Sequence, residues 1–139
     1  MFDEILTNDS IIIVFVRITI PIFLMIVFIQ SGLDKIINKK ENLDWLREHF
    51  GKTFLKYFTP YLLILLTILE IISGLILFVG ITLYMINDQF HFIIYGLMIS
   101  NITFLCLFFG QRIAKDYVGA ADLVNYFILS VIGLLVFLY

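Results

Sequence analysis

The chain has 139 residues, of which 62% are hydrophobic and 14% are charged. Soluble domains carry about 45–50% apolar and about 25% charged residues, so this composition excludes an ordinary soluble domain and indicates an integral membrane protein. The length fits one membrane domain over residues 1–139. The net charge of −2 says little about partners, because the charges are segregated between loops, and no nucleic acid is expected.

Four apolar runs follow one another along the chain, at residues 11–32, 61–86, 92–110 and 123–139. A helix needs about 20 residues to cross the hydrocarbon, so each run can span the membrane, the last one barely. Lipid offers no hydrogen-bond partners to the backbone, so all four runs are expected to be α-helices. The sequence therefore predicts an all-α, polytopic membrane protein with four transmembrane helices in a bundle.

The acidic start of the chain, MFDEILTNDS, lacks the basic segment of a cleavable signal peptide, so the first apolar run is expected to be retained. The single cysteine, Cys106, excludes an intrachain disulfide and a CxxC redox pair. It is expected to be a small buried apolar residue.

The distribution of basic residues predicts the orientation of the helices. Of the nine Lys and Arg residues, six lie in segment 33–60 and two in segment 111–122. By the positive-inside rule, both segments are expected to be cytoplasmic. Both termini are then expected on the non-cytoplasmic side.

The segment between the first two apolar runs is amphipathic. Its apolar residues recur at spacings of three and four, as in a helix: Leu43, Leu46, Phe50, Phe54 and Tyr57. This pattern predicts an interfacial helix over about 41–58 that lies on the membrane. It would act either as a lid or docking surface or as a simple connector, and the connector is favoured.

Glu70 is the only charged residue between Tyr61 and Val79. A carboxylate at that depth costs roughly 2.5–3.5 kcal/mol on insertion scales, so it should carry a partner or be protonated. The only basic residue inside another apolar run is Arg17. The central prediction is therefore an intramembrane charge pair between Arg17 and Glu70, and counting about 1.5 Å per residue puts the two at similar depth. The alternative is that Arg17 reaches the outer surface and Glu70 is protonated.

Other polar residues are candidates for lining a polar or ligand-binding cluster: Gln30, Ser31, Asp34, Lys35, Asn101 and Asn125. For Asp34 and Lys35 the favoured interpretation is that they anchor a helix end in the interface. Asn101 and Asn125 fit interhelical hydrogen bonds.

Several short motifs occur in order along the whole chain: Arg17, SGLDK at 31–35, Pro60, LEIISG at 69–74, Gly80, Arg112 and YVGAAD at 117–122. Together they resemble the DoxX family of small four-helix bacterial membrane proteins. The family takes its name from a subunit of a thiosulfate:quinone oxidoreductase. The resemblance implies a multi-pass protein of the bacterial inner membrane.

For function, the resemblance implies a small accessory or assembly subunit of a larger membrane redox complex. The alternative is a quinone-interacting oxidoreductase subunit. The sequence carries no self-contained catalytic motif, so any redox activity would need a partner subunit or a diffusible donor. The expected partners are the lipid bilayer and other membrane subunits. No intrinsic cofactor is expected, and a quinone or a lipid is the candidate ligand.

Other chemistry is disfavoured by the residues present. His49 and His91 are expected on opposite membrane faces, so they cannot together ligate one haem. The sequence has no Cys/His cluster, HExxH motif or glycine-rich phosphate loop, which argues against a metal site, metal-dependent hydrolysis and nucleotide chemistry.

Overall fold

The computed structural model describes the backbone of residues 2–139 and the side chains of residues 10–139. This part of the chain is helical, without strands, and its elements follow in the order α1 (Phe2–Ile37), α2 (Lys39–His49), η1 (Phe54–Phe58), α3 (Thr59–Asn87), α4 (His91–Ile113), α5 (Tyr117–Leu135) and η2 (Val136–Leu138).

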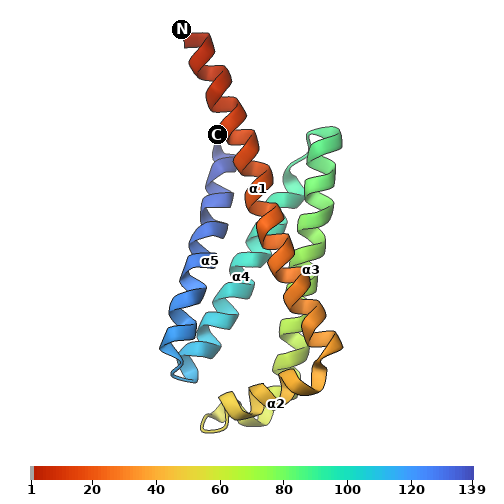
Figure 1. The fold of residues 1–139 in the computed structure, drawn as a ribbon, viewed down its shortest axis with the longest axis vertical. Coiled ribbons are helices and arrows are strands. Elements are labelled where there is room, and N and C mark those ends of the chain that lie inside the picture. Colours follow the sequence, from red (N-terminus) through yellow and green to blue (C-terminus); the bar gives the residue numbers. More distant parts are fainter. Residues whose placement is uncertain (1) are drawn as a thin grey trace.

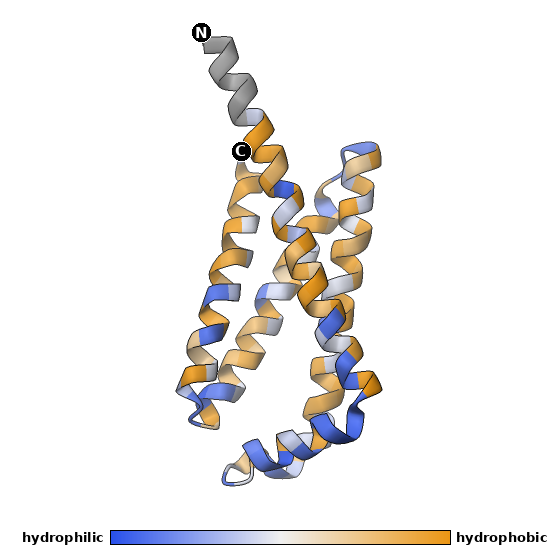
Figure 2. Ribbon diagram, viewed as in Figure 1, coloured by the Kyte–Doolittle hydropathy of each residue, from blue (hydrophilic) through white to orange (hydrophobic). Residues whose placement is uncertain are grey.

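Four helical stretches of the described chain are long and apolar enough to cross a membrane: Ser10–Ile37, Phe54–Asn87, His91–Ile113 and Tyr117–Leu138. This confirms the prediction of an all-α protein with four candidate spans. Figure 2 shows apolar residues along all four long helices, whereas hydrophilic residues gather over α2 and the turns at that end of the bundle.

The long helices pack in the order α1, α3, α4 and α5, with a smaller contact between α1 and α5 that closes the bundle. Figure 1 shows both chain ends at the end of the bundle that also carries the α3–α4 turn. The α2 helix and the α4–α5 turn lie at the opposite end. The two segments richest in basic residues therefore share one end of the molecule.

Glycines bring α1 and α3 into close contact. A Cβ added to Gly74 would lie 3.2 Å from the backbone nitrogen of Ile29 and 2.5 Å from that residue's side chain. A Cβ added to Gly32 would lie 2.6 Å from the Ile71 Cδ1 atom. Such small residues allow membrane helices to approach closely, and they fix the register in which α1 passes α3.

Hydroxyl and amide side chains join the other helix pairs. Ser73 on α3 and Thr103 on α4 share a hydrogen bond of 3.2 Å between their hydroxyl oxygens. The Ser130 hydroxyl on α5 donates to the Asn101 Oδ1 atom on α4 at 2.5 Å. Around these contacts lies an apolar core that includes Leu24, Phe28, Leu77, Ile93 and Leu97, each at most 1% exposed. These polar residues therefore serve helix packing.

The amphipathic segment differs from its prediction. A single helix was expected over 41–58, but α2 ends at His49 and the 3-10 helix η1 begins only at Phe54. The chain between them turns at Gly51, a poor helix former, and Thr53 has an extended backbone. Placement of α2 on a membrane surface remains a prediction.

The break in this segment also divides its apolar stripe. Leu46 and Phe50 are buried and form a small core with Leu63 of α3, whereas Phe54 and Tyr57 are exposed. The first half of the predicted stripe therefore holds α2 against the bundle.

The last helix begins earlier than its apolar run. It was expected from residue 123, but α5 starts at Tyr117 because the Asp116 Oδ1 atom accepts a hydrogen bond of 2.9 Å from the Gly119 backbone nitrogen. A side chain that accepts from the first turn in this way is a helix N-cap.

Candidate functional site: a cavity between α2, α3 and α4

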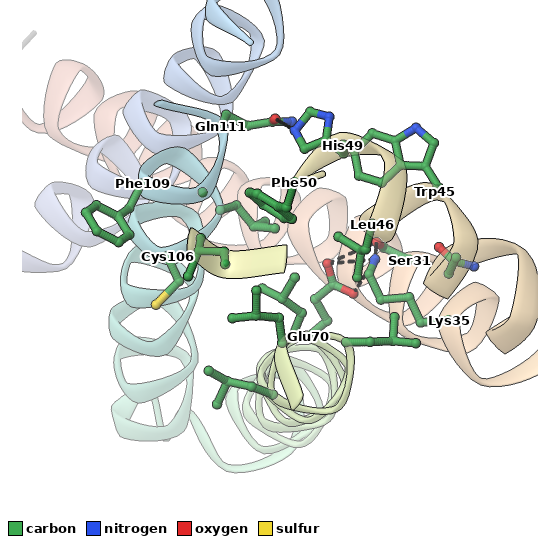
Figure 3. A pocket seen from close by; sticks show the side chains of 18 residues that line it. Ser31, Lys35, Trp45, Leu46, His49, Phe50, Glu70, Cys106, Phe109 and Gln111 are labelled. Carbon is green, nitrogen blue, oxygen red and sulfur yellow. Dashed lines mark hydrogen bonds and ion pairs between the residues drawn. The ribbon is translucent and has the colours of Figure 1, made fainter. Parts of the chain in front are cut away.

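Glu70 is buried at the α1–α3 interface with only 2% of its surface exposed. The Lys35 Nζ atom lies 3.2 Å from Oε1 and 3.0 Å from Oε2 of this carboxylate. The same ammonium donates to the Ser31 hydroxyl oxygen at 3.0 Å, and that hydroxyl donates to Glu70 Oε1 at 3.1 Å. Lys35, Ser31 and Glu70 therefore form a closed polar cluster, which Figure 3 shows on one wall of a cavity.

The predicted pair between Arg17 and Glu70 is not formed in this structure. Arg17 instead donates from Nε and Nη2 to the Val136 carbonyl oxygen, at 3.3 and 3.2 Å. Its guanidinium carbon also lies 5.1 Å from the centre of the Phe137 ring. Arg17 thus links α1 to η2 by hydrogen bonds, at the end of the bundle that carries both chain ends.

The helix register explains this correction. The contacts of Gly32 with Ile71 and of Gly74 with Ile29 place Ser31 beside Glu70. Arg17 precedes Ser31 by fourteen residues on the same helix, which is about 21 Å at about 1.5 Å per residue. An arginine side chain cannot span that distance. The prediction ended the first helix near Gly32, whereas α1 continues to Ile37 and carries Lys35 to the carboxylate.

A cavity of about 410 Å³ adjoins this polar cluster. Ser31, Lys35 and Glu70 contribute to one wall. Leucines of α2, η1 and α3 supply apolar surface, namely Leu46, Leu55, Leu62, Leu63, Leu65 and Leu66. The remaining lining residues come from segment 42–50 and from α4, which contributes Leu107, Phe109 and Gly110 among others. Because Leu65 and Phe109 are 48% and 62% exposed, the cavity reaches the apolar outer surface between α3 and α4.

A second polar contact lies on another part of the lining. The His49 Nε2 atom lies 2.6 Å from the Gln111 Oε1 atom, and since an amide oxygen can only accept, the imidazole is the donor. The His49 ring stacks on Trp45 with 4.4 Å between ring centres, and Phe50 contacts it edge-on. This contact joins α2 to the end of α4 and places Trp45 beside the cavity (Figure 3).

The remaining predicted residues lie away from the ion pair. Gln30 and Asp34 line a shallow groove on the outer side of α1, where Asp34 accepts hydrogen bonds from Asn38 and Asn42. Asn101 binds Ser130 at the α4–α5 interface. Asn125 is exposed on α5. Of the six candidates, the structure brings Ser31 and Lys35 to Glu70.

Some residues of the site were not among the sequence candidates. His49 and Gln111 are 62 positions apart in the chain, and no local pattern links them. The sequence does contain a sign that Lys35 joins Ser31 at Glu70, because Ser31 and Lys35 are four residues apart and share a helix face. Cys106 lines the cavity and is exposed, so the expectation that it is buried is wrong.

Fold and site together define a multi-pass, all-α membrane protein with a buried ion pair beside a cavity at one end of its bundle. Comparison with protein-family models, with curated proteins and with solved structures gives no match. Among residues 10–139, no cluster of His, Cys, Asp and Glu side chains is arranged to hold a metal ion. The site offers apolar walls and two separate polar contacts, the Lys35–Glu70 ion pair and the His49–Gln111 hydrogen bond.

Proposed function

We propose that this chain holds the polar head group of a lipid-soluble small molecule in the cavity, and that a quinone is the favoured class. The observation that supports this proposal is the position of the Lys35–Glu70 ion pair on the wall of a mostly apolar cavity. Ligand sites combine apolar walls with a few polar groups that orient the ligand, and typical volumes are about 300–1,000 Å³.

The ion pair on the lining suits a quinone head group in particular. A quinone carbonyl oxygen accepts hydrogen bonds, and the Lys35 ammonium is a donor on the lining. A tail can leave between α3 and α4, where Leu65 and Phe109 reach the outer surface. The resemblance to the DoxX family supports the same class of ligand.

In this proposal the chain acts as an accessory subunit of a larger membrane redox complex in the bacterial inner membrane. The cavity supplies a binding place for the quinone, and a partner subunit or diffusible donor supplies or removes electrons. The accessory role rests on the resemblance.

A second candidate function is assembly of the larger complex without a small ligand. The specific observation in its favour is Asn125, whose side chain is exposed on α5 eight residues into the helix. An amide that faces lipid at that depth lacks partners, whereas a neighbouring transmembrane helix can supply them. Copurification with other membrane subunits that is lost in Asn125→Leu would favour this candidate.

The binding proposal is tested by titrating the detergent-solubilised protein with a short-tailed benzoquinone. Trp45 lines the cavity and is the only tryptophan in the chain, so its fluorescence reports on the site. We expect saturable quenching. In a Trp45→Phe/Phe54→Trp variant the reporter moves to an exposed position that does not line the cavity, and only linear quenching is expected. Linear quenching from both positions would contradict the proposal.

A further inference from the structure

The Glu70 carboxylate has one oxygen that accepts no hydrogen bond. Oε1 accepts from both Lys35 and Ser31. Oε2 is buried without a hydrogen-bond partner of suitable geometry, although the Lys35 ammonium lies 3.0 Å away. Buried polar atoms nearly always have a hydrogen-bond partner, and a buried atom whose hydrogen bond is not made costs free energy. Oε2 itself is closed to solvent, so a donor held in the cavity that Glu70 lines supplies this bond once the carboxylate turns toward it.

The Lys35 ammonium has a complementary capacity. It carries three N–H groups, and two of them are used in hydrogen bonds to Ser31 Oγ and Glu70 Oε1. Lys35 also lines the cavity. The cluster therefore offers an acceptor, Glu70 Oε2, and a donor, the third N–H of Lys35, close to one another.

The charge of the cluster restricts the head group further. Lys35 and Glu70 neutralise one another, and their side chains are only 16% and 3% exposed. A charged head group would add a charge without a counterion to this apolar cavity, which is strongly unfavourable. A neutral group that both donates and accepts is favoured instead.

We propose that the head group bound at this cluster is a neutral hydroxyl, which donates to Glu70 Oε2 and accepts from Lys35. This inference rests on the proposed function, because it specifies the chemistry of the ligand that the cavity holds. A ketone or an ether can accept from Lys35 but cannot donate to the carboxylate. Among quinone-type molecules, the inference therefore assigns the reduced, hydroxyl-bearing form to this position.

The test compares two probes, ω-bromooctanol and its methyl ether, which share a chain and an acceptor oxygen but of which only the alcohol can donate a hydrogen bond. Bromine quenches tryptophan fluorescence, so saturable quenching of Trp45 gives a dissociation constant for each probe in detergent solution. A hydrogen bond to a charged group contributes about 1.5–3 kcal/mol, so the alcohol is expected to bind at least roughly tenfold more tightly than the ether.

Two variants with matched substitutions assign the preference to the site. Glu70→Gln replaces one acceptor oxygen by an amide donor, and the preference for the alcohol is expected to disappear. Glu41→Gln makes the same change on the exposed side of α2, outside the cavity lining, and should retain the preference.

The outcomes distinguish a failure of the hydroxyl assignment from a failure of ligand binding in the cavity. Equal binding of alcohol and ether to the unmodified protein would overturn the hydroxyl inference while supporting a ligand-binding cavity. No saturable quenching by either probe would contradict both. The comparison of the alcohol with the ether in the unmodified protein tests the hydroxyl assignment even if Glu70→Gln does not fold.

Discussion

Lys35 and Glu70 form an ion pair across the α1–α3 interface, with 3.0 Å between Nζ and Oε2. The pair lies where α1 approaches its end at Ile37, so the lysine reaches inward from that end to a carboxylate within the span. Desolvation of two charges offsets much of their attraction, but leaving one of them alone is far worse. The pair therefore fixes the position of α1 against α3 and forms one wall of the cavity.

Removing the ammonium should destabilise the protein strongly. In Lys35→Met the Glu70 carboxylate loses its counterion while it stays buried, and removal of one partner of a buried pair costs about 3–5 kcal/mol. Lys35→Met/Glu70→Leu replaces both charges by apolar groups and should recover most of that loss. Reversible unfolding in mixed micelles measures both. A double variant as unstable as the single one would show that the pair is not the source of the effect.

The effects of substitutions at Arg17 and Glu70 should be additive. Arg17 contacts Val136 and Phe137, and Glu70 contacts Ser31 and Lys35, so the two residues share no partner. Distant sites without shared partners add to within about 0.3–0.5 kcal/mol. We expect this for Arg17→Met combined with Glu70→Gln in the unfolding free energy. The effects of Lys35→Met and Glu70→Gln on the unfolding free energy should instead be strongly non-additive. If the Lys35 and Glu70 effects were additive and the Arg17 and Glu70 effects were not, Glu70 would pair with Arg17, as the sequence predicts.

Gly80 should tolerate no side chain. A Cβ at this position would lie 2.6 Å from the backbone nitrogen of Ile93, so Gly80→Ala forces α3 and α4 apart. Overpacking of this kind costs about 1–3 kcal/mol. The matched control is Gly110→Ala, whose nearest neighbour would be the Phe50 ring at 3.4 Å. Alanine favours a helix over glycine by about 1 kcal/mol, so the control should unfold at the same or a higher temperature. Equal destabilisation by both substitutions would argue against the close α3–α4 contact.

The orientation in the membrane is a further prediction. The positive-inside rule places segments 33–60 and 111–122 in the cytoplasm. Alkaline phosphatase, which is active only after export, should therefore be active when fused after Tyr139 in a bacterial host. The same enzyme inserted after Lys115, in the α4–α5 turn, should be inactive. The reverse pattern would invert the protein in the membrane and move the cavity to the outer side.

The four helices could be predicted because the length and the hydropathy of an apolar run indicate a membrane-spanning helix without knowledge of its neighbours. The partner of Glu70 could not, because it depends on where α1 ends and on how α1 and α3 align. The polar residues of SGLDK suggested a helix end near Gly32, yet α1 continues through them to Ile37. The α1–α3 register is fixed by the close approach of Gly32 to Ile71, which no single-helix pattern reveals.

The cavity itself was beyond sequence reasoning for a similar reason. Its lining comes from four separate segments, one of which is α2 at the end of the bundle (Figure 1). Periodicity identified Leu46 and Phe50 as one apolar stripe but continued it to Phe54 and Tyr57, which are exposed. The contact of His49 with Gln111 joins segments 62 positions apart and appears only once the chain has folded.

The most direct test of ligand binding is mass spectrometry of extracts from the purified protein and two matched variants. Leu66→Trp fills the cavity from its wall, whereas Ile68→Trp adds the same bulk two residues away, at a half-exposed position outside the lining. A lipid-soluble small molecule should accompany the unmodified protein and Ile68→Trp in a fixed ratio and be depleted from Leu66→Trp. Equal amounts in all three proteins, or none in any, would contradict the account.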